Sequence, residues 1–450
     1  MKRSIEGQMI HRTAAKSMFW GSVMTLAYMF VLFPLLVIVR AVMRPKPVQA
    51  GAIEPPLTVV IAAYNEVSAI ATKLDNLLGL DYPCERVTII VASDGSNDGT
   101  NDVVRSYAGR NVRLLELPRV GKAAALRAAV DASADEILVF TDANSIFGKA
   151  SLRELVAPFA DPEIGGVAGN QVYRSSSTPS EAGEQTYWGF DRLLKEFESR
   201  AGNTIAATGA VYSIRRAHFR PVPSGVNDDS FVSLGVIRHG RRLVFARQAI
   251  AYEPPAPSLD AEYQRKVRVL SRGLRGLAAM SDLLDVRRHG FYSIQLFSHK
   301  VLRWLLFVPV GLLALASALL ARSGPLYSAA ALTQVTFYSA AVAGLLLRRH
   351  RLGQSRLLTV PAYFVVANAA AARATWNFVT GRQIDRWQTV RDHQAAVPHS
   401  GGSAAAHQAA VGDARSQGAK PGEDRRWVVT PPQAGDGATR VAERVRDVGE

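Results

Sequence analysis

VTIIVASDGSNDGT (residues 87–100) and ILVFTDAN (residues 137–144) each begin as an apolar run rich in β-branched residues. The first run stops on Asp94 and the second on Asp142. Runs of this kind are typical of buried parallel strands, here with a carboxylate at the carboxyl end of each strand. Because ligands of open α/β sheets bind just outside those ends, we expect Asp94 and Asp142 to lie at one crevice.

The same alternation continues around these stretches. Strands are predicted at residues 57–63, 87–93, 112–117 and 137–141, and helices at residues 66–78, 100–107 and 122–132. This βαβ order predicts the α/β class with a doubly wound, mostly parallel sheet. No GxGxxG follows the first strand and no GxxxxGKS or GxxxxGKT occurs, so a dinucleotide fingerprint and a P-loop are excluded.

Residues 143–252 show a less regular pattern. A helix is predicted at residues 184–199, a strand or turn leading into a helix at 209–216, and a short strand at 243–246. Between the last two lies Asn227-Asp228-Asp229, ahead of a helix predicted at residues 230–238. These acidic residues suit either a helix N-cap or a base at the crevice.

The composition excludes several classes of protein. The chain has 450 residues, 48% hydrophobic and 20% charged, which is enough for two or more domains and too apolar for a disordered chain. Its formal net charge of +15 suits an anionic membrane surface or nucleic acid. Cys84 is the single cysteine, so no internal disulfide exists, and no Cys/His cluster suggests zinc.

An uncharged apolar run at residues 17–39 is long enough to span a bilayer. A signal peptide is the competing interpretation. The run is long for one, and Arg40, Arg44 and Lys46 precede any cleavage point that the sequence offers. We therefore expect a retained transmembrane anchor and linker over residues 1–50.

Two further uncharged runs lie at residues 304–321 and 323–347. Arg303 flanks them on one side and the basic residues 348–351 on the other. Positive-inside logic puts both outer ends, and with them the catalytic half, at the cytoplasmic face of a multi-pass protein of the cell membrane.

The remaining segments complete the predicted division of the chain. The run at residues 357–372 is interrupted by Pro361 and is marginal as a span, so three or four crossings are expected. The composition of the last residues predicts a disordered tail. The predicted parts are residues 1–50 (anchor), 51–256 (catalytic domain), 257–300 (interfacial amphipathic helices), 301–392 (membrane segments) and 393–450 (tail).

A basic amphipathic helix is predicted at residues 260–286, just before the membrane segments. Its arginine stripe consists of Arg265, Arg268, Arg272 and Arg275. A solvated basic face would explain the stripe, but the position favours a helix that lies at the membrane interface.

The motifs, taken in order, resemble family 2 glycosyltransferases, and more narrowly the membrane-embedded synthases of cellulose, hyaluronan and poly-N-acetylglucosamine. The likeness covers residues 57–275. Its six motifs are IAAYNE (61–66), SDGS (93–96), GKAAAL (121–126), DAN (142–144), GA (209–210) and DD (228–229). Six motifs in this order, between membrane segments, form a strong signal.

This resemblance implies a GT-A fold and inverting transfer from a nucleotide-diphosphate sugar, with UDP as the expected nucleotide. It also implies site residues: Tyr64, Glu66 and Asp94 for the nucleoside, Lys122 near the nucleotide, Asp142 and Asn144 in the D-x-D element that carries Mg²⁺ or Mn²⁺, and Asp229, with Asp228 before it, as the base. The chemistry asks for these residue types independently. A hard cation takes oxygen ligands and offsets the charge of the leaving diphosphate, and a carboxylate accepts the proton of a sugar hydroxyl.

Three departures from the family pattern bear on function. Asn144 stands where many relatives have Asp, which removes one charge from the metal site. Arg127 stands where many have Asn. The Q-x-x-R-W signature of processive synthases is incomplete, because Gln264, Arg265 and Arg268 are present without the Trp. Gln264, Arg265 and Arg268 are still expected to face the diphosphate or the acceptor.

The sequence therefore predicts a membrane-bound inverting glycosyltransferase that acts on a polysaccharide acceptor. Transfer of one sugar to a lipid acceptor, either a polyprenyl phosphate or a diacylglycerol, is the first alternative. A basic, membrane-tethered binding protein for anionic lipid or nucleic acid is the second. This second alternative leaves Asp94, Asp142 and Asp229 unexplained, because acidic residues repel anionic partners. We therefore expect no nucleic-acid partner.

Overall fold

The computed structural model describes residues 2–173, 181–254, 258–348 and 350–382. The tail predicted at residues 393–450 lies outside the described residues. The linker that follows the N-terminal helices, residues 45–56, has no helix or strand, in line with its prolines.

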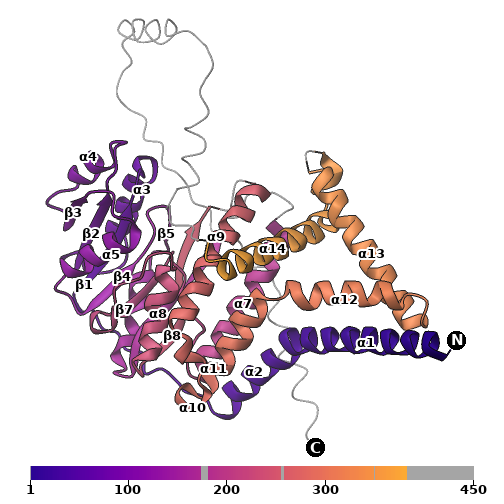
Figure 1. Ribbon diagram of the computed structural model, residues 1–450. Helices are drawn as coiled ribbons and strands as arrows, with labels where there is room; N and C mark the ends of the chain where they lie inside the picture. Colours follow the sequence, from indigo (N-terminus) through magenta and orange to yellow (C-terminus); the bar gives the residue numbers. More distant parts are fainter. Residues whose placement is uncertain (1, 174–180, 255–257, 349, 383–450) are drawn as a thin grey trace, which may run out of the picture. The chain divides into compact units, whose positions relative to one another are not determined.

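The described residues contain one mixed sheet (Figure 1). Its strands are β1 Leu57–Ala63, β2 Val87–Asp94, β3 Val112–Leu117, β4 Ile137–Phe140, β5 Ile146–Phe147, β6 Ile164–Tyr173, β7 Tyr212–Arg215 and β8 Arg242–Glu253. Their spatial order is β3-β2-β1-β4-β7-β6-β8-β5. The pairs among β3, β2, β1 and β4 are parallel, as is the β6–β8 pair, whereas β7 and β5 run antiparallel to their neighbours. The predicted α/β class with a mostly parallel sheet is confirmed.

Seven α-helices accompany the sheet in the described part of the chain. They are α3 Val67–Leu78, α4 Thr100–Arg105, α5 Lys122–Asp131, α6 Ser151–Val156, α7 Glu181–Ala201, α8 Asp228–Arg238 and α9 Leu259–Ala279. Short 3-10 turns are η2 Cys84–Arg86, η3 Ala157–Ala160, η4 Arg216–His218, η5 Ser281–Leu284 and η7 Arg351–Gln354. Every helix and strand predicted before residue 142 begins and ends within two residues of the observed element.

Two predictions about element length were wrong. The short strand predicted at residues 243–246 is the first part of β8, which continues to Glu253. Arg247 and Gln248 break its apolar pattern at a register shift, after which pairing with β6 resumes at Ile250. The helix predicted at residues 260–286 ends at Ala279, after which the chain forms the η5 turn.

Strand β1 shows how the sheet is covered on both faces. Val59 and Ile61 pack into one buried cluster, which includes Ile70 of α3. Val60 packs into a second cluster, which includes Leu126 of α5. Because successive side chains of a strand point to opposite faces, burial on both faces requires a strand that is apolar apart from Thr58. The acidic residues Asp94 and Asp142 lie at the carboxyl ends of β2 and β4.

The remaining helices flank this domain in the sequence. They are α1 Lys2–Ala27, α2 Phe33–Met43, α10 Val286–His289, α11 Phe291–Gln295, α12 Phe307–Leu320, α13 Pro325–Leu346 and α14 Arg356–Val379, with π-helical turns η1 Tyr28–Leu32 and η6 Leu296–Leu302. Within the described residues, His11–Met43, α13 and α14 are long and apolar enough to cross a membrane. Phe291–Leu302 with α12, bent by 57°, would make a fourth span.

The run at residues 357–372, predicted as a marginal span, lies within a longer helix. The helix that contains it, α14, has 24 residues and continues past Arg373 to Val379. Arg373 interrupts the apolar run without ending the helix, because arginine is a good helix former.

Candidate active site

Asp142 lies in the loop that follows β4, and Lys73 of α3 holds this loop in place. The fully buried Lys73 of α3 donates from Nζ to Thr141 Oγ1 (2.9 Å) and to the Ser145 carbonyl (2.6 Å). Gly209 lies so close that a Cβ there would be 3.1 Å from Asp142 Oδ2. The side chain of Asp142 is 34% exposed, so a ligand can reach its carboxylate.

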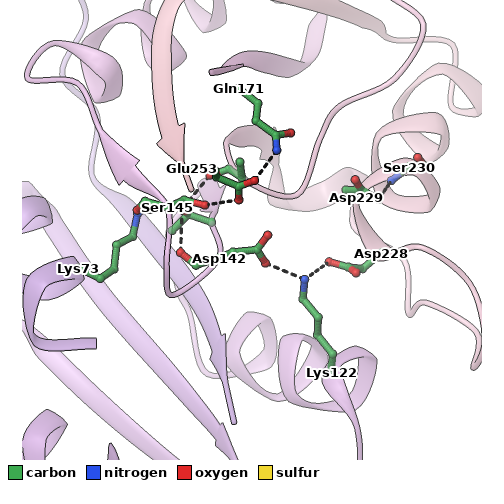
Figure 2. A network of polar contacts seen from close by, with 11 residues as sticks. Lys73, Lys122, Asp142, Ser145, Gln171, Asp228, Asp229, Ser230 and Glu253 are labelled. Carbon is green, nitrogen blue, oxygen red and sulfur yellow. Dashed lines mark hydrogen bonds and ion pairs between the residues drawn. The ribbon is translucent and has the colours of Figure 1, made fainter. Parts of the chain in front are cut away.

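Lys122, the first residue of α5, joins the loop after β4 to α8. Its Nζ lies 2.9 Å from Asp142 Oδ1 and 3.2 Å from Asp228 Oδ2 (Figure 2). Burial disfavours the ammonium, but the two carboxylates outweigh burial and raise the pKa of Lys122. A cation at a helix N-terminus opposes the helix dipole, so these carboxylates also compensate for an unfavourable position. The structure thus brings Lys122, Asp142 and Asp228 together.

Asp228 and Asp229 lie in the first turn of α8, and Asn227 precedes them as the N-cap residue. The alternative in which one of the two aspartates caps the helix is therefore wrong. Ser230 N–H donates to Asp229 Oδ1 (2.6 Å). Burial and the negative charge of Asp228 raise the pKa of Asp229 to about 6. Such a carboxylate is mostly ionised at neutral pH and still accepts a proton readily.

A second polar group lies at the carboxyl ends of β1 and β2. The buried Asp94 carboxylate accepts hydrogen bonds from Val120 N–H (2.7 Å) and Gly121 N–H (2.8 Å) and forms an ion pair with Arg119. The Arg119 guanidinium in turn lies 3.3 Å from the centroid of the Tyr64 ring. Asp94 therefore has protein partners of its own and holds the turn that leads into α5.

Glu66 is buried at the start of α3, where its backbone N–H donates to Thr100 Oγ1 (2.9 Å). This contact ties the first turn of α3 to that of α4. Glu66 thus lies close to the ends of β1 and β2, where the resemblance places the nucleoside.

The predicted residues of α9 face different surroundings. Arg265 donates to Tyr173 Oη (2.8 Å) and to Glu262 (2.7 Å). Arg268 lies near enough to Asp142 for their charges to interact. Gln264 is exposed. Part of the arginine stripe therefore faces Asp142. This stripe is neither wholly exposed to solvent nor wholly at the membrane interface.

Comparison with protein families gives this geometry a context. Residues 58–220 match the model of Glycosyl transferase family 2. The chain contains a family 2 glycosyltransferase domain. The resemblance drawn from the six motifs is thereby confirmed.

Curated relatives of this family 2 domain include poly-beta-1,6-N-acetyl-D-glucosamine synthases. That of Staphylococcus aureus (strain COL) is 25% identical over 222 residues, which are 47% of this chain and 53% of the relative. That of Staphylococcus epidermidis (strain ATCC 35984) is 24% identical over 204 residues, which are 44% of this chain and 48% of the relative. The chain spans about half the length of these relatives.

Among solved structures, a mannosyltransferase from Pyrobaculum calidifontis in complex with GDP-Man and Mn²⁺ shares the fold. The TM-score is 0.58 at 22% sequence identity, over 83% of this chain and 99% of that chain. The expected GT-A-like architecture is confirmed by this likeness.

The carboxylates of this domain fit a divalent cation that takes some of its ligands from the protein and the rest from a substrate. Mg²⁺ in proteins is commonly held by one or two carboxylates together with substrate phosphates, and the accessible Asp142 is such a carboxylate. In the described part of the chain, no three His, Cys, Asp or Glu side chains are placed to hold a metal by themselves. The Lys122 ammonium between Asp142 and Asp228 already marks a position that attracts a cation.

Glu253, the last residue of β8, lies near Asp142, and it was not predicted as a site residue from the sequence. Ser145 Oγ donates to its Oε1 (2.7 Å), and Gln171 Nε2 donates to its Oε2. Burial and the charge of Asp142 raise the pKa of Glu253. AIAYE (249–253) is an apolar strand end that stops on an acidic residue, which is the signal that identified Asp94 and Asp142.

Lys73 was also missed. It shares the buried face of α3 with Ile70, Leu74 and Leu77. Burial lowers the pKa of Lys73 to about 7, although the charges of Asp142 and Glu253 oppose that shift. The sequence did contain a signal for Lys73. A lysine on the apolar stripe of an amphipathic helix is buried, and a buried charge requires acidic or polar partners.

Proposed function

We propose that this protein is a membrane-bound inverting glycosyltransferase that moves a sugar from a nucleotide-diphosphate sugar to a hydroxyl of a polysaccharide acceptor. The observation that carries the proposal is the bridge made by Lys122 between Asp142 and Asp228. It gathers acidic residues from the end of β4 and the start of α8 around one position. A charged donor and its acceptor have to meet at such a position.

In this proposal Asp229 is the general base. Its carboxylate takes the proton of the acceptor hydroxyl while the hydroxyl oxygen forms the new bond to the anomeric carbon. The bond between that carbon and the diphosphate breaks on the opposite face, which inverts the configuration. A positioned base of this kind contributes about 10²–10⁴-fold to the rate. The raised pKa of Asp229, about 6, suits it to this exchange.

The other residues position the donor. Lys122 pairs with the diphosphate oxygens, and Tyr64, Glu66 and Asp94 form the nucleoside side of the crevice. Asp142, with the Asn144 amide oxygen, would hold Mg²⁺ or Mn²⁺, which offsets the negative charge of the leaving diphosphate.

The relatives support a glycan acceptor, since they are named as synthases of a polymer of N-acetylglucosamine. The helices long enough to cross a membrane support a membrane location. The basic residues around Arg303 and at positions 348–351 favour a cytoplasmic catalytic domain in a multi-pass protein of the cell membrane.

A small cleft beside the base is the observation behind a second candidate function, the transfer of one sugar to a lipid acceptor such as a polyprenyl phosphate. The cleft is lined by apolar Leu234, Leu277 and Leu296, by Trp304, and by the cations Arg272 and Lys300. Lys300 Nζ lies 3.4 Å from the hydroxyl of Ser230, the residue after Asp229. The space between these side chains is only about 10 Å³ in this structure, so an acceptor with a phosphate head and a hydrocarbon tail would need them to move apart.

The full-length protein in detergent or nanodiscs, incubated with UDP- and GDP-sugars and Mg²⁺ or Mn²⁺, tests the proposal. We expect release of nucleoside diphosphate from one donor, and loss of that release in Asp229→Asn with donor binding retained. Asp131→Asn, which changes an exposed aspartate of α5, is the matched control and should behave as wild type. Full turnover in Asp229→Asn would remove Asp229 as the base.

Product size separates the acceptor classes. A ladder of polymer lengths supports the polysaccharide acceptor, and a single added sugar on an extracted lipid supports the second candidate. Binding to anionic vesicles that falls steeply with salt, without turnover of any sugar nucleotide, would instead identify a membrane-tethered binding protein.

A further inference from the structure

Glu253 reaches the carboxylate cluster through strand pairing. β8 pairs with β5 in antiparallel register, with Tyr252 opposite Ile146. This register places Glu253 beside Ser145, three residues after Asp142, and the 2.7 Å hydrogen bond from Ser145 Oγ fixes the contact. Glu253 thus approaches the loop after β4 from a strand that lies more than a hundred residues later in the chain.

Asp142 and Glu253 lie on the same side of this loop (Figure 2), and the negative charge of each acts on the other. Both residues are only partly buried, and the Asp142 side chain is 34% exposed. Lys73 lies on the inner side of the loop, where Thr141 and the Ser145 carbonyl hold its ammonium. The charge of Asp142 disfavours the ionised form of Glu253, and a cation between the two carboxylates would relieve this repulsion.

Asn144 leaves the loop after β4 with one carboxylate fewer than the D-x-D spacing can carry. The D-x-D spacing of the loop has an amide where a second charge would stand, so Asp142 alone supplies the loop with a charged oxygen. A neutral amide oxygen is a weaker ligand for a hard divalent cation than a carboxylate. A carboxylate from β8 restores the missing charge without changing the loop.

We propose that Glu253 is a ligand of the divalent cation at Asp142, and that it supplies the charge that Asn144 lacks. This inference rests on the proposed function, because the cation is the one that the nucleotide-sugar donor requires. Asp142 and Glu253 would hold the cation together, and the remaining ligands that such a cation needs would come from the substrate and water. Ser145 and Gln171, which donate to Glu253, orient the carboxylate.

The competing explanation is that Glu253 only anchors Ser145 and Gln171. Two substitutions separate the explanations. Glu253→Gln keeps an oxygen that accepts from Ser145 but removes the charge. Glu253→Asp keeps the charge but shortens the reach to both donors. A ligand role harms the Gln variant more, whereas an anchoring role harms the Asp variant more.

The experiment measures Mn²⁺ binding to the full-length protein by electron paramagnetic resonance, with UDP or GDP present, and needs no turnover. We expect Glu253→Gln to weaken Mn²⁺ affinity by about 10- to 100-fold, and Asp142→Asn to weaken it at least as much. Adding Asn144→Asp to Glu253→Gln should restore part of the loss. Glu136→Gln, which changes an exposed glutamate on another part of the domain, is the control.

Unfolding temperatures of all variants establish that each is folded. Wild-type affinity in Glu253→Gln together with weak binding in Asp142→Asn overturns this inference and leaves the proposed function standing. Loss in Glu253→Asp with wild-type affinity in Glu253→Gln also overturns it. If the wild-type protein binds no Mn²⁺ with either nucleotide, the metal-dependent function proposed above fails as well.

Discussion

The Nζ atom of Lys122 lies 2.9 Å from Oδ1 of Asp142, and this contact connects the start of α5 to the end of β4. The same ammonium reaches Asp228, so it is the common partner of two acidic segments that are 86 residues apart in the sequence. A cation that neutralises two carboxylates in a partly buried site stabilises their approach to each other.

Removing this cation should uncouple the two segments. We expect Lys122→Met to lower kcat/KM by about 10²-fold or more, since both the charge for the diphosphate and the balance of Asp142 and Asp228 are lost. Nucleotide release measures the effect. Arg127→Met changes an exposed cation of the same helix, which pairs with Asp131 at 3.5 Å, and should leave kcat/KM unchanged. Equal losses in the two variants would rule out a specific role for Lys122.

The pH dependence of turnover reports on Asp229. Burial and the charge of Asp228 disfavour the ionised form and raise the pKa of Asp229 to about 6. Only the ionised form accepts a proton, so turnover should rise about tenfold per pH unit below that value and level off above it. Asp228→Asn removes the neighbouring charge and should move the midpoint to lower pH. A rate that is flat from pH 5 to pH 8 would contradict this assignment.

Gly209 leaves room for the Asp142 carboxylate. A Cβ at this position would lie 3.1 Å from Oδ2, which is closer than ordinary van der Waals contact. We expect Gly209→Ala to displace Asp142 and to lower kcat/KM by about tenfold, since small misplacements of reacting groups are costly. Gly189→Ala lies in helix α7 with open space around its Cβ and should not affect activity.

Stability should depend on pH through Lys73. Burial lowers the pKa of Lys73 from 10.5 to about 7, so between these values the unfolded chain binds a proton that the folded chain lacks. The free energy of unfolding should therefore rise with pH across this window, by up to about 1.4 kcal/mol per pH unit from this group. Below pH 7 both states are protonated and the contribution is constant. Lys73→Met should remove the slope, as measured by denaturant unfolding at several pH values.

The strands, helices and acidic strand ends before residue 142 were predictable because their signals are local. Burial on both faces of β1, β2 and β4 requires continuous apolar runs, and Asp94 and Asp142 interrupt those runs where the strands end. The length of β8 was not predictable from such a pattern. Its middle carries Arg247 and Gln248, and the strand continues to Glu253 because its pairing with β6 resumes at Ile250 and its end also pairs with β5.

The sequence by itself determined the α/β class, the apolar helices at both ends of the chain and the identity of the acidic strand ends, because each depends on residues within a few positions of one another. Tertiary structure alone decided which charges meet. The pairing of β5 with β8 brings Glu253 to the loop of Asp142, and α5 brings Lys122 between Asp142 and Asp228. Hydrophobic burial drives that folding without regard to sequence distance, so the partners of a charged side chain are set only when the sheet has assembled.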